Sequence, residues 1–177
     1  MANPLDPVME WFRTALDSMR VTQRTLKKEL PGAITYRHVF FKQPLTDCTE
    51  RLQAATEELE RLVVLALTAI FERTLRDYLV QMPLIGLPPG DPHGDAVRDE
   101  IIKDIEFWNI STRVTEVFPG VDPAVRGQVK QIIDYRNWVA HGQTIAKPAP
   151  TNVVPVKAYE VLTTFLLQAR VITGTKK

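Results

Sequence analysis

The sequence predicts an all-α protein, and three observations lead to that prediction. Apolar residues recur at intervals of three and four along most of the chain, which is the spacing of one face of an α-helix. Two loops rich in proline and glycine, at 83–94 and 147–155, separate these periodic stretches, and neither would fit a helix or a central strand. The sequence has no internal repeat and no low-complexity tract. The expected architecture is therefore a bundle of helices joined by loops.

The first predicted helix runs from about Pro7 to Leu30, and Pro31-Gly32 ends it. Its apolar residues are loosely spaced on one side: Trp11, Ala15, Met19 and Leu26. Residues 33–44 are apolar and aromatic without a clear period, which fits a short strand pair or an ordered loop. We expect residues 1–45 to form an N-terminal helical arm or bundle extension, which can complete the bundle, extend a dimer or dock a partner.

The second helix has the strongest pattern, from a cap at Thr46 or Asp47 to about Gln81, before Pro83. Its buried face is predicted to contain Leu52, Leu59, Leu62, Val63, Ala66, Ile70, Leu75, Tyr78 and Leu79. Glutamates dominate its first turns and arginines its last turns, which complements the helix dipole.

Three more helices are expected, over about 95–116, 122–140 and 156–172. Pro123 suits the first position of the fourth helix. The buried stripe predicted for the fourth helix is Val125, Val129, Ile132, Ile133 and Ala140, and for the last helix Leu162, Phe165, Leu166 and Ala169.

Composition narrows the possible settings and partners. The chain has 177 residues, enough for one compact domain, and a net charge of +1, so any nucleic-acid binding would need positive charge concentrated locally. No stretch approaches the ~20 apolar residues of a membrane span, and the N-terminus does not resemble a secretory signal. With a single cysteine, Cys48, these features predict a cytoplasmic protein that does not enter the membrane.

The sequence predicts neither a metal nor a cofactor. Cys48, His38 and His93 do not have metal-ligand spacing. The glutamates within 57–60 lack the Glu-x-x-His repeat of di-iron bundles and fit a solvated first turn. No glycine-rich phosphate loop is present.

The most informative segment is Arg136-Asn137-Trp138-Val139-Ala140-His141, followed by Gly142. A guanidinium is a permanent, fork-shaped phosphate binder, and an imidazole can give or take a proton near neutral pH. Arg136 follows Ile132 and Ile133 by four and three residues, so it falls on the apolar stripe. Its charge there needs a partner: an internal carboxylate such as Glu72 or Asp134, a subunit interface, or an anionic ligand.

Arg136 and His141 diverge on an ideal helix, because five residues rotate by about 140° and rise by about 7.5 Å. They can converge if the helix ends near Ala140, or if two copies of the chain contribute across a symmetric interface. Gly142 favours a helix end, since glycine is common just beyond one. His141 would then lie in the terminal turn, where it can also serve simply as a C-terminal cap.

This hexapeptide resembles the Arg-Asn-x-x-x-His signature of the HEPN superfamily, and Asp134-Tyr135 and Gly142 are also at home there. The segment Leu65–Leu79, with Phe71-Glu72-Arg73 at its centre, resembles the long helix of HEPN domains related to the RiboL-PSP group. The resemblance covers about 46–172. It implies a four- to five-helix HEPN-type bundle over 46–177, with 1–45 as the arm.

The resemblance also implies an activity. Many HEPN proteins are metal-independent endoribonucleases, often toxins or anti-phage effectors, whose dimers join two motifs in one cleft. In that case His141 would act as general base or acid, Arg136 would hold the scissile phosphate, and Asn137 would orient the histidine or bind a phosphate oxygen. Glu72 would orient Arg136. The implied partners are an RNA substrate, a second copy of the chain, and a cognate antitoxin or regulatory protein.

Other residues extend this hypothesis. Arg126 and Lys130 share a helix face and could continue a phosphate track, although two solvated cations would look the same. Trp138 could stack a base, but we favour a place in the dimer interface. Gln143 stands where some HEPN toxins carry a modified tyrosine, so regulation by that route is not expected.

Two alternatives to the enzyme stay open. The first is a catalytically silent HEPN module for dimerisation and RNA or protein binding. The second is a regulatory helical protein whose motif is coincidental. The enzyme is favoured because Arg136, Asn137 and His141 are all present.

Overall fold

The computed structural model describes residues 2–28, 39–82, 92–142 and 150–173. Within these ranges the chain forms α-helices, one short π-helix and no strand, which confirms the all-α prediction. The elements are α1 (Asp6–Lys27), α2 (Leu45–Gln81), α3 (Pro92–Phe107), the π-helix η1 (Ile110–Val114), α4 (Pro123–Ala140) and α5 (Pro155–Gln168).

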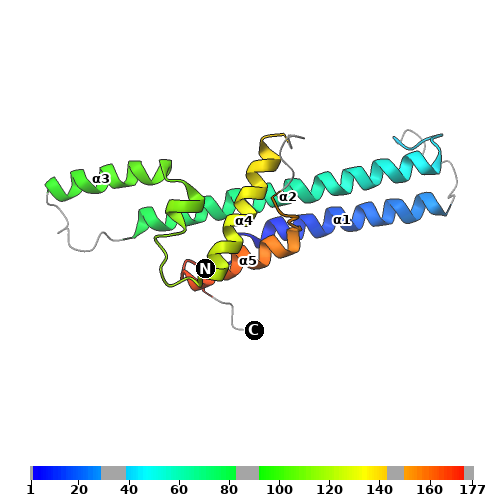
Figure 1. Ribbon diagram of the computed structural model, residues 1–177. Helices are drawn as coiled ribbons and strands as arrows, with labels where there is room; N and C mark the ends of the chain where they lie inside the picture. The colour runs from blue at the N-terminus through cyan, green and yellow to red at the C-terminus, as the bar shows by residue number, and fades with distance from the viewer. Residues whose placement is uncertain (1, 29–38, 83–91, 143–149, 174–177) are drawn as a thin grey trace.

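The 37-residue helix α2, roughly 55 Å long, is the element around which the others are arranged. Figure 1 shows α1 lying antiparallel to the first half of α2, α4 and α5 crossing its middle, and α3 beside its far end. None of the helices in the described ranges combines the length and hydrophobicity needed to span a bilayer.

One apolar core lies where α1, α2, α4 and α5 meet. Phe165 is fully buried at its centre and packs edge-to-face on Phe71 and Phe118, with ring centroids 5.3 and 5.8 Å apart. The first half of α1 adds Leu5, Met9 and Phe12 to the same core. The core therefore crosses the predicted boundary at residue 45, and this part of the arm belongs to the bundle.

Hydrogen bonds fix the start of α1 against α5. Tyr159 donates its hydroxyl proton to Asp6 Oδ1 at 2.6 Å, and the Asn3 amide donates to Thr163 Oγ1 at 2.9 Å. The other half of α1 extends past α5 and packs on α2 as a two-helix hairpin (Figure 1).

The prediction of a single helix over 95–116 is wrong, because the helix is interrupted at Trp108 and Asn109. Asn109 is extended, and its side-chain Oδ1 accepts hydrogen bonds from the backbone N–H groups of Ser111 and Thr112 at 2.9 and 3.2 Å. An asparagine in this position caps a new helix instead of continuing the old one. The result is α3, a break, and then η1.

Several smaller predictions are also wrong, among them the burial of Leu62, which is 48% exposed. Helix α2 begins after an extended Pro44 with no side-chain cap, and Asp47 acts instead through its charge in the first turn. Trp11 is 53% exposed, because the face of α1 that meets α2 and α5 is the one with Met9 and Phe12. Ala140 is exposed, because the last turn of α4 extends beyond the core (Figure 1).

The ends of two other helices differ slightly from prediction. Helix α5 stops at Gln168, since Arg170 adopts a left-handed conformation (φ 59°) and returns Val171 and Ile172 to the core. Helix α1 stops at Lys27. The predicted Pro31-Gly32 stop and most of the 33–44 segment lie outside the described residues, and so do the side chains of His38 and His93.

Replacing the central aromatic residue tests this core. We expect Phe165→Ala to lower the free energy of unfolding by about 3–5 kcal/mol, because it removes both ring contacts and leaves a cavity. Urea denaturation followed by circular dichroism measures the change. Phe107→Ala is the control, since Phe107 is 86% exposed, and should change stability by less than ~0.5 kcal/mol. Equal effects of the two substitutions would contradict the packing described.

Candidate functional site

Helix α4 carries the motif, and both of its ends are fixed by local chemistry. Asp122 Oδ1 accepts from the Ala124 N–H at 2.7 Å, and Pro123 occupies the first turn. His141 is the C-cap, and Gly142 follows with φ 80°, a left-handed conformation that favours glycine. The predicted helix end is thus confirmed.

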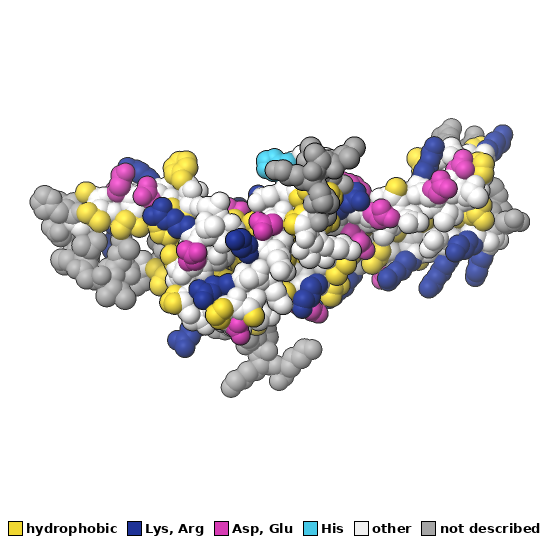
Figure 2. Space-filling model, in the orientation of Figure 1, with side chains coloured by type: hydrophobic (Ala, Val, Ile, Leu, Met, Phe, Trp, Pro, Cys, Tyr) yellow, Lys and Arg dark blue, Asp and Glu magenta, His cyan; other side chains and the backbone are white. Residues whose placement is uncertain are grey.

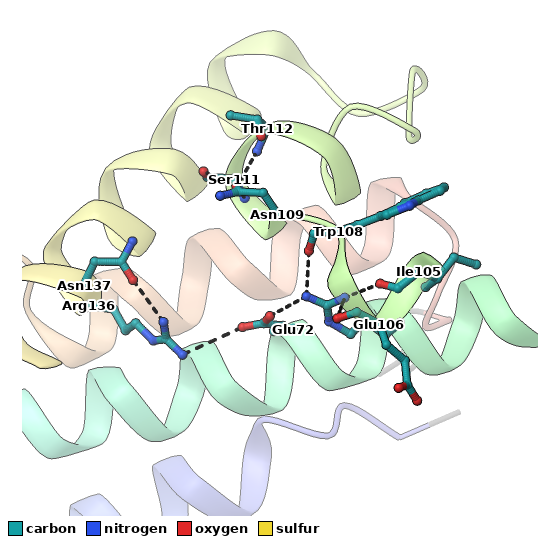
Figure 3. A network of polar contacts seen from close by, with 10 residues as sticks. Glu72, Ile105, Glu106, Trp108, Asn109, Ser111, Thr112, Arg136 and Asn137 are labelled. Carbon is teal, nitrogen blue, oxygen red and sulfur yellow. Dashed lines mark hydrogen bonds and ion pairs between the residues drawn. The ribbon is translucent and has the colours of Figure 1, made fainter. Parts of the chain in front are cut away.

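The side chain of Arg136 is 34% exposed and has two neighbours (Figure 3). Its Nη1 donates to Asn137 Oδ1 at 2.9 Å, and its Nη2 lies 3.9 Å from Glu72 Oε2. Of the two carboxylates suggested by the sequence, Glu72 is therefore the partner, whereas Asp134 is exposed. At 3.9 Å this is an ion pair without a direct hydrogen bond, so the guanidinium keeps donors for another acceptor.

Glu72 is shared with a second guanidinium. Its Oε1 accepts from Arg76 Nη2 at 2.7 Å, and Arg76 also donates to the backbone carbonyls of Ile105, Glu106 (2.8 Å) and Trp108 (2.7 Å) at the end of α3. Figure 3 shows this chain of contacts running from α4 through Glu72 to α3. One carboxylate thus interacts with two guanidiniums, so it compensates the charge of each only in part.

A hollow of about 320 Å³ opens beside this network, with Arg136 at its α4 side. The residues that line it are Ala69, Glu72, Arg73, Arg76, Asp77, Val80, Ile105, Glu106 and Arg136. This lining contains three arginines and three carboxylates, and Arg136 is the only residue of α4 in it. The described residues contain no group of three His, Cys, Asp or Glu side chains placed to hold a metal ion.

His141 does not line that hollow. It is exposed, and its backbone N–H donates to the Asn137 carbonyl at 3.0 Å, as expected for the last turn. Since α4 is regular from Pro123 to Ala140, the two side chains leave the helix about 140° apart. Arg136 therefore contacts Asn137 and Glu72 beside the hollow, whereas the side chain of His141 does not reach it.

The three candidate RNA-binding residues all belong to α4, and their positions around the helix differ. Arg126 and Lys130 precede Asn137 by eleven and seven residues, so they share its side of α4, which is also the side of His141. Lys130 is exposed and Arg126 is half-buried. Trp138 is partly buried, with its ring 5.9 Å from that of Tyr135.

Comparison with other proteins adds no assignment. No family model matches this chain, and no curated protein or solved structure shows a significant match. The interpretation of the site rests on its geometry and on the motif.

Sequence reasoning missed two features. Arg76 is one, although its spacing of four from Glu72 on one helix is a signal for an ion pair. The other is a row of exposed cations along α1: Arg13, Arg20, Arg24 and Lys27. They are spaced by seven, four and three residues, which places them on one face, and Figure 2 shows Lys and Arg side chains gathered there. This row is a local concentration of positive charge away from α4.

The role of Arg76 can be measured directly. We expect Arg76→Met to lower the free energy of unfolding by about 2 kcal/mol, because three carbonyls of α3 and Glu72 lose a charged donor. Chemical denaturation provides the measurement. Arg73→Met is the matched control on the same helix, where an 83% exposed side chain makes only a loose ion pair with Asp77. A loss no larger than that of Arg73→Met would show that Arg76 does not hold α3.

Proposed function

We propose that the protein is a metal-independent endoribonuclease that acts as a homodimer, serving as a cytoplasmic toxin or anti-phage defence effector. Its two reactive groups would be Arg136 and His141, in the pattern that resembles the HEPN motif. The observation that carries the proposal is the separation of these groups on α4: Arg136 borders an open hollow, whereas His141 lies exposed at the helix end.

The chemistry needs one group to move protons and another to stabilise charge. The 2′-hydroxyl of one nucleotide attacks the adjacent phosphorus, the bond from phosphorus to the 5′-oxygen breaks, and a cyclic phosphate and a 5′-hydroxyl result. An imidazole such as His141 accepts the proton of the 2′-hydroxyl or donates one to the leaving oxygen. The guanidinium of Arg136 stabilises the extra negative charge on the phosphate oxygens.

The position of Arg136 supports this role. Asn137 Oδ1 accepts one of its N–H groups and fixes its orientation, while Glu72 compensates its charge from 3.9 Å. Glu72 also interacts with Arg76, so it is only a partial partner for Arg136. A phosphate entering the hollow would find donors that are already positioned, which is a requirement for electrostatic catalysis.

A symmetric dimer can bring the side chains of Arg136 and His141 together, although they point apart within one chain. If the ends of two α4 helices meet around a two-fold axis, Arg136 of one chain can face the same phosphate as His141 of its partner. Ala140, His141 and Gly142 at the end of α4 are exposed, which leaves room for such a contact. Such a nuclease would also need restraint in its own host, by an antitoxin or a regulatory protein.

One observation favours the alternative, a silent HEPN module for dimerisation and RNA or protein binding. Arg136 belongs to a network that joins α2, α3 and α4, so this side chain also has a structural reason to be present. A structural role for Arg136 does not account for His141, which is exposed.

Cleavage of RNA in the presence of EDTA tests the proposal. We expect the full chain to cut RNA and leave cyclic-phosphate ends, and we expect Arg136→Ala and His141→Ala each to reduce the rate by at least ~100-fold. Electrophoresis of end-labelled RNA measures the rate. Arg51→Ala, which removes an exposed arginine of α2 that lines neither this hollow nor the one beside Trp138, is the control and should cut normally.

Two results would count against the enzyme. Equal cleavage by all four proteins would mean that Arg136 and His141 are not the reactive groups. RNA binding without cleavage by the wild type would favour the silent module.

A further inference from the structure

A second hollow, of about 370 Å³, lies between α2, α4 and the segment that leads into α5. The residues that line it are Glu57, Glu60, Arg61, Tyr135, Trp138, Asn152 and Val153. Trp138 precedes His141 by three residues, so the two are neighbours on the helix surface. This hollow is thus on the His141 side of α4, whereas the Arg136 hollow is bounded by α2 and α3.

Aromatic and apolar surface forms one side of this hollow. The rings of Tyr135 and Trp138 are 5.9 Å apart and inclined by 35°, and Val153 is buried beside them. Tryptophan side chains are preferred surfaces for stacking unpaired RNA bases. The volume is in the range of small-ligand sites.

Opposite charges form the polar side. Glu60 is half-buried and makes no hydrogen bond or ion pair within the described part of the chain. Arg61 next to it is paired with Glu58 at 3.1 Å and lies 3.9 Å from Glu57. A guanidinium has five N–H donors, so the two carboxylates and a hydrogen bond to Tyr135 do not occupy all the donors of Arg61.

Tyr135 lines the same hollow as Glu60 and Arg61, and the charges of both affect the pKa of its hydroxyl group. Burial raises the pKa of Tyr135, while Arg61 lowers it through its charge and a hydrogen bond, and the charge of Glu60 raises it. An acceptor and a donor are available side by side, next to an aromatic surface.

We propose that this hollow binds a guanine base of the RNA, next to the bond that is cut. Guanine carries two adjacent N–H donors, at N1 and N2, beside its O6 acceptor, and the other three bases lack that pair of donors. Glu60 accepts from N1 and N2, Arg61 donates to O6, and Trp138 stacks on the ring. This inference rests on the proposed function, because it takes the ligand to be RNA.

Binding of short RNAs tests the inference without requiring cleavage. The full chain carrying His141→Ala is titrated, by fluorescence anisotropy, into a labelled oligouridylate with one central guanosine and into versions with adenosine, cytidine or uridine there. We expect the guanosine version to bind about tenfold more tightly, the discrimination of one good bidentate contact. Glu60→Gln should reduce that preference to less than twofold. Glu50→Gln, which removes the same charge from an exposed site on α2, should leave it intact.

A second pair of variants tests stacking. Trp138→Ala should weaken binding of the guanosine version about tenfold, and Trp138→Phe should restore most of the loss. Circular dichroism verifies that each variant is folded. Equal binding of the four RNAs, or a guanosine preference that survives Glu60→Gln, would overturn the inference. A guanosine preference without cleavage by the wild type would contradict the proposed nuclease activity and support the guanine pocket. Cleavage without a base preference would support the nuclease activity and contradict the guanine pocket.

Discussion

The interaction on which the arrangement of this protein depends is the sharing of the Glu72 carboxylate between Arg76 and Arg136. Arg76 donates hydrogen bonds to the carbonyls at the end of α3, and Arg136 belongs to α4. Glu72 of α2 interacts with both arginines and so links the three helices. Partly buried guanidiniums are costly without a counter-charge. Glu72 supplies one negative charge to two cations, and this shared contact holds the three helices together.

Helix geometry then decides what one chain can do alone. The turn of α4 directs Arg136 towards the hollow beside α3, while Asn137 and His141 share another side with Arg126 and Lys130. Trp138, three residues before His141, lines a second hollow with Tyr135 and Glu60. A single chain thus separates Arg136, which we propose binds the phosphate, from His141, which we propose transfers the proton, and we infer that a second copy brings the two together.

The sequence predicts the parts of this structure that depend on local signals. The periodicity of α2, Pro123 at the start of α4 and Gly142 after its end are all local, and those elements were predicted nearly residue by residue. The break at Asn109 was not predicted, because apolar periodicity does not show that a side-chain amide will take over the backbone N–H groups of Ser111 and Thr112.

The candidate site was only partly predictable for a related reason. Glu72 could be proposed as the partner of Arg136 from the sequence. The hydrogen bonds from Arg76 to the carbonyls at the end of α3 join residues about thirty positions apart, and no spacing rule predicts such contacts. The exposure of Trp11 depends on where α2 and α5 pack, and the hollow near Trp138 draws on three separate segments.

If one site combines Arg136 of one chain with His141 of the other, two variants that are each inactive should restore activity when they are mixed. Arg136→Ala and His141→Ala chains, each inactive alone, are allowed to exchange subunits, and the formation of mixed dimers is verified with two affinity tags. Our account predicts that the mixture recovers RNA cleavage, because a mixed dimer contains one complete Arg136–His141 pair across the interface. Mixed dimers that form but stay inactive, while the wild type cuts RNA, would contradict it.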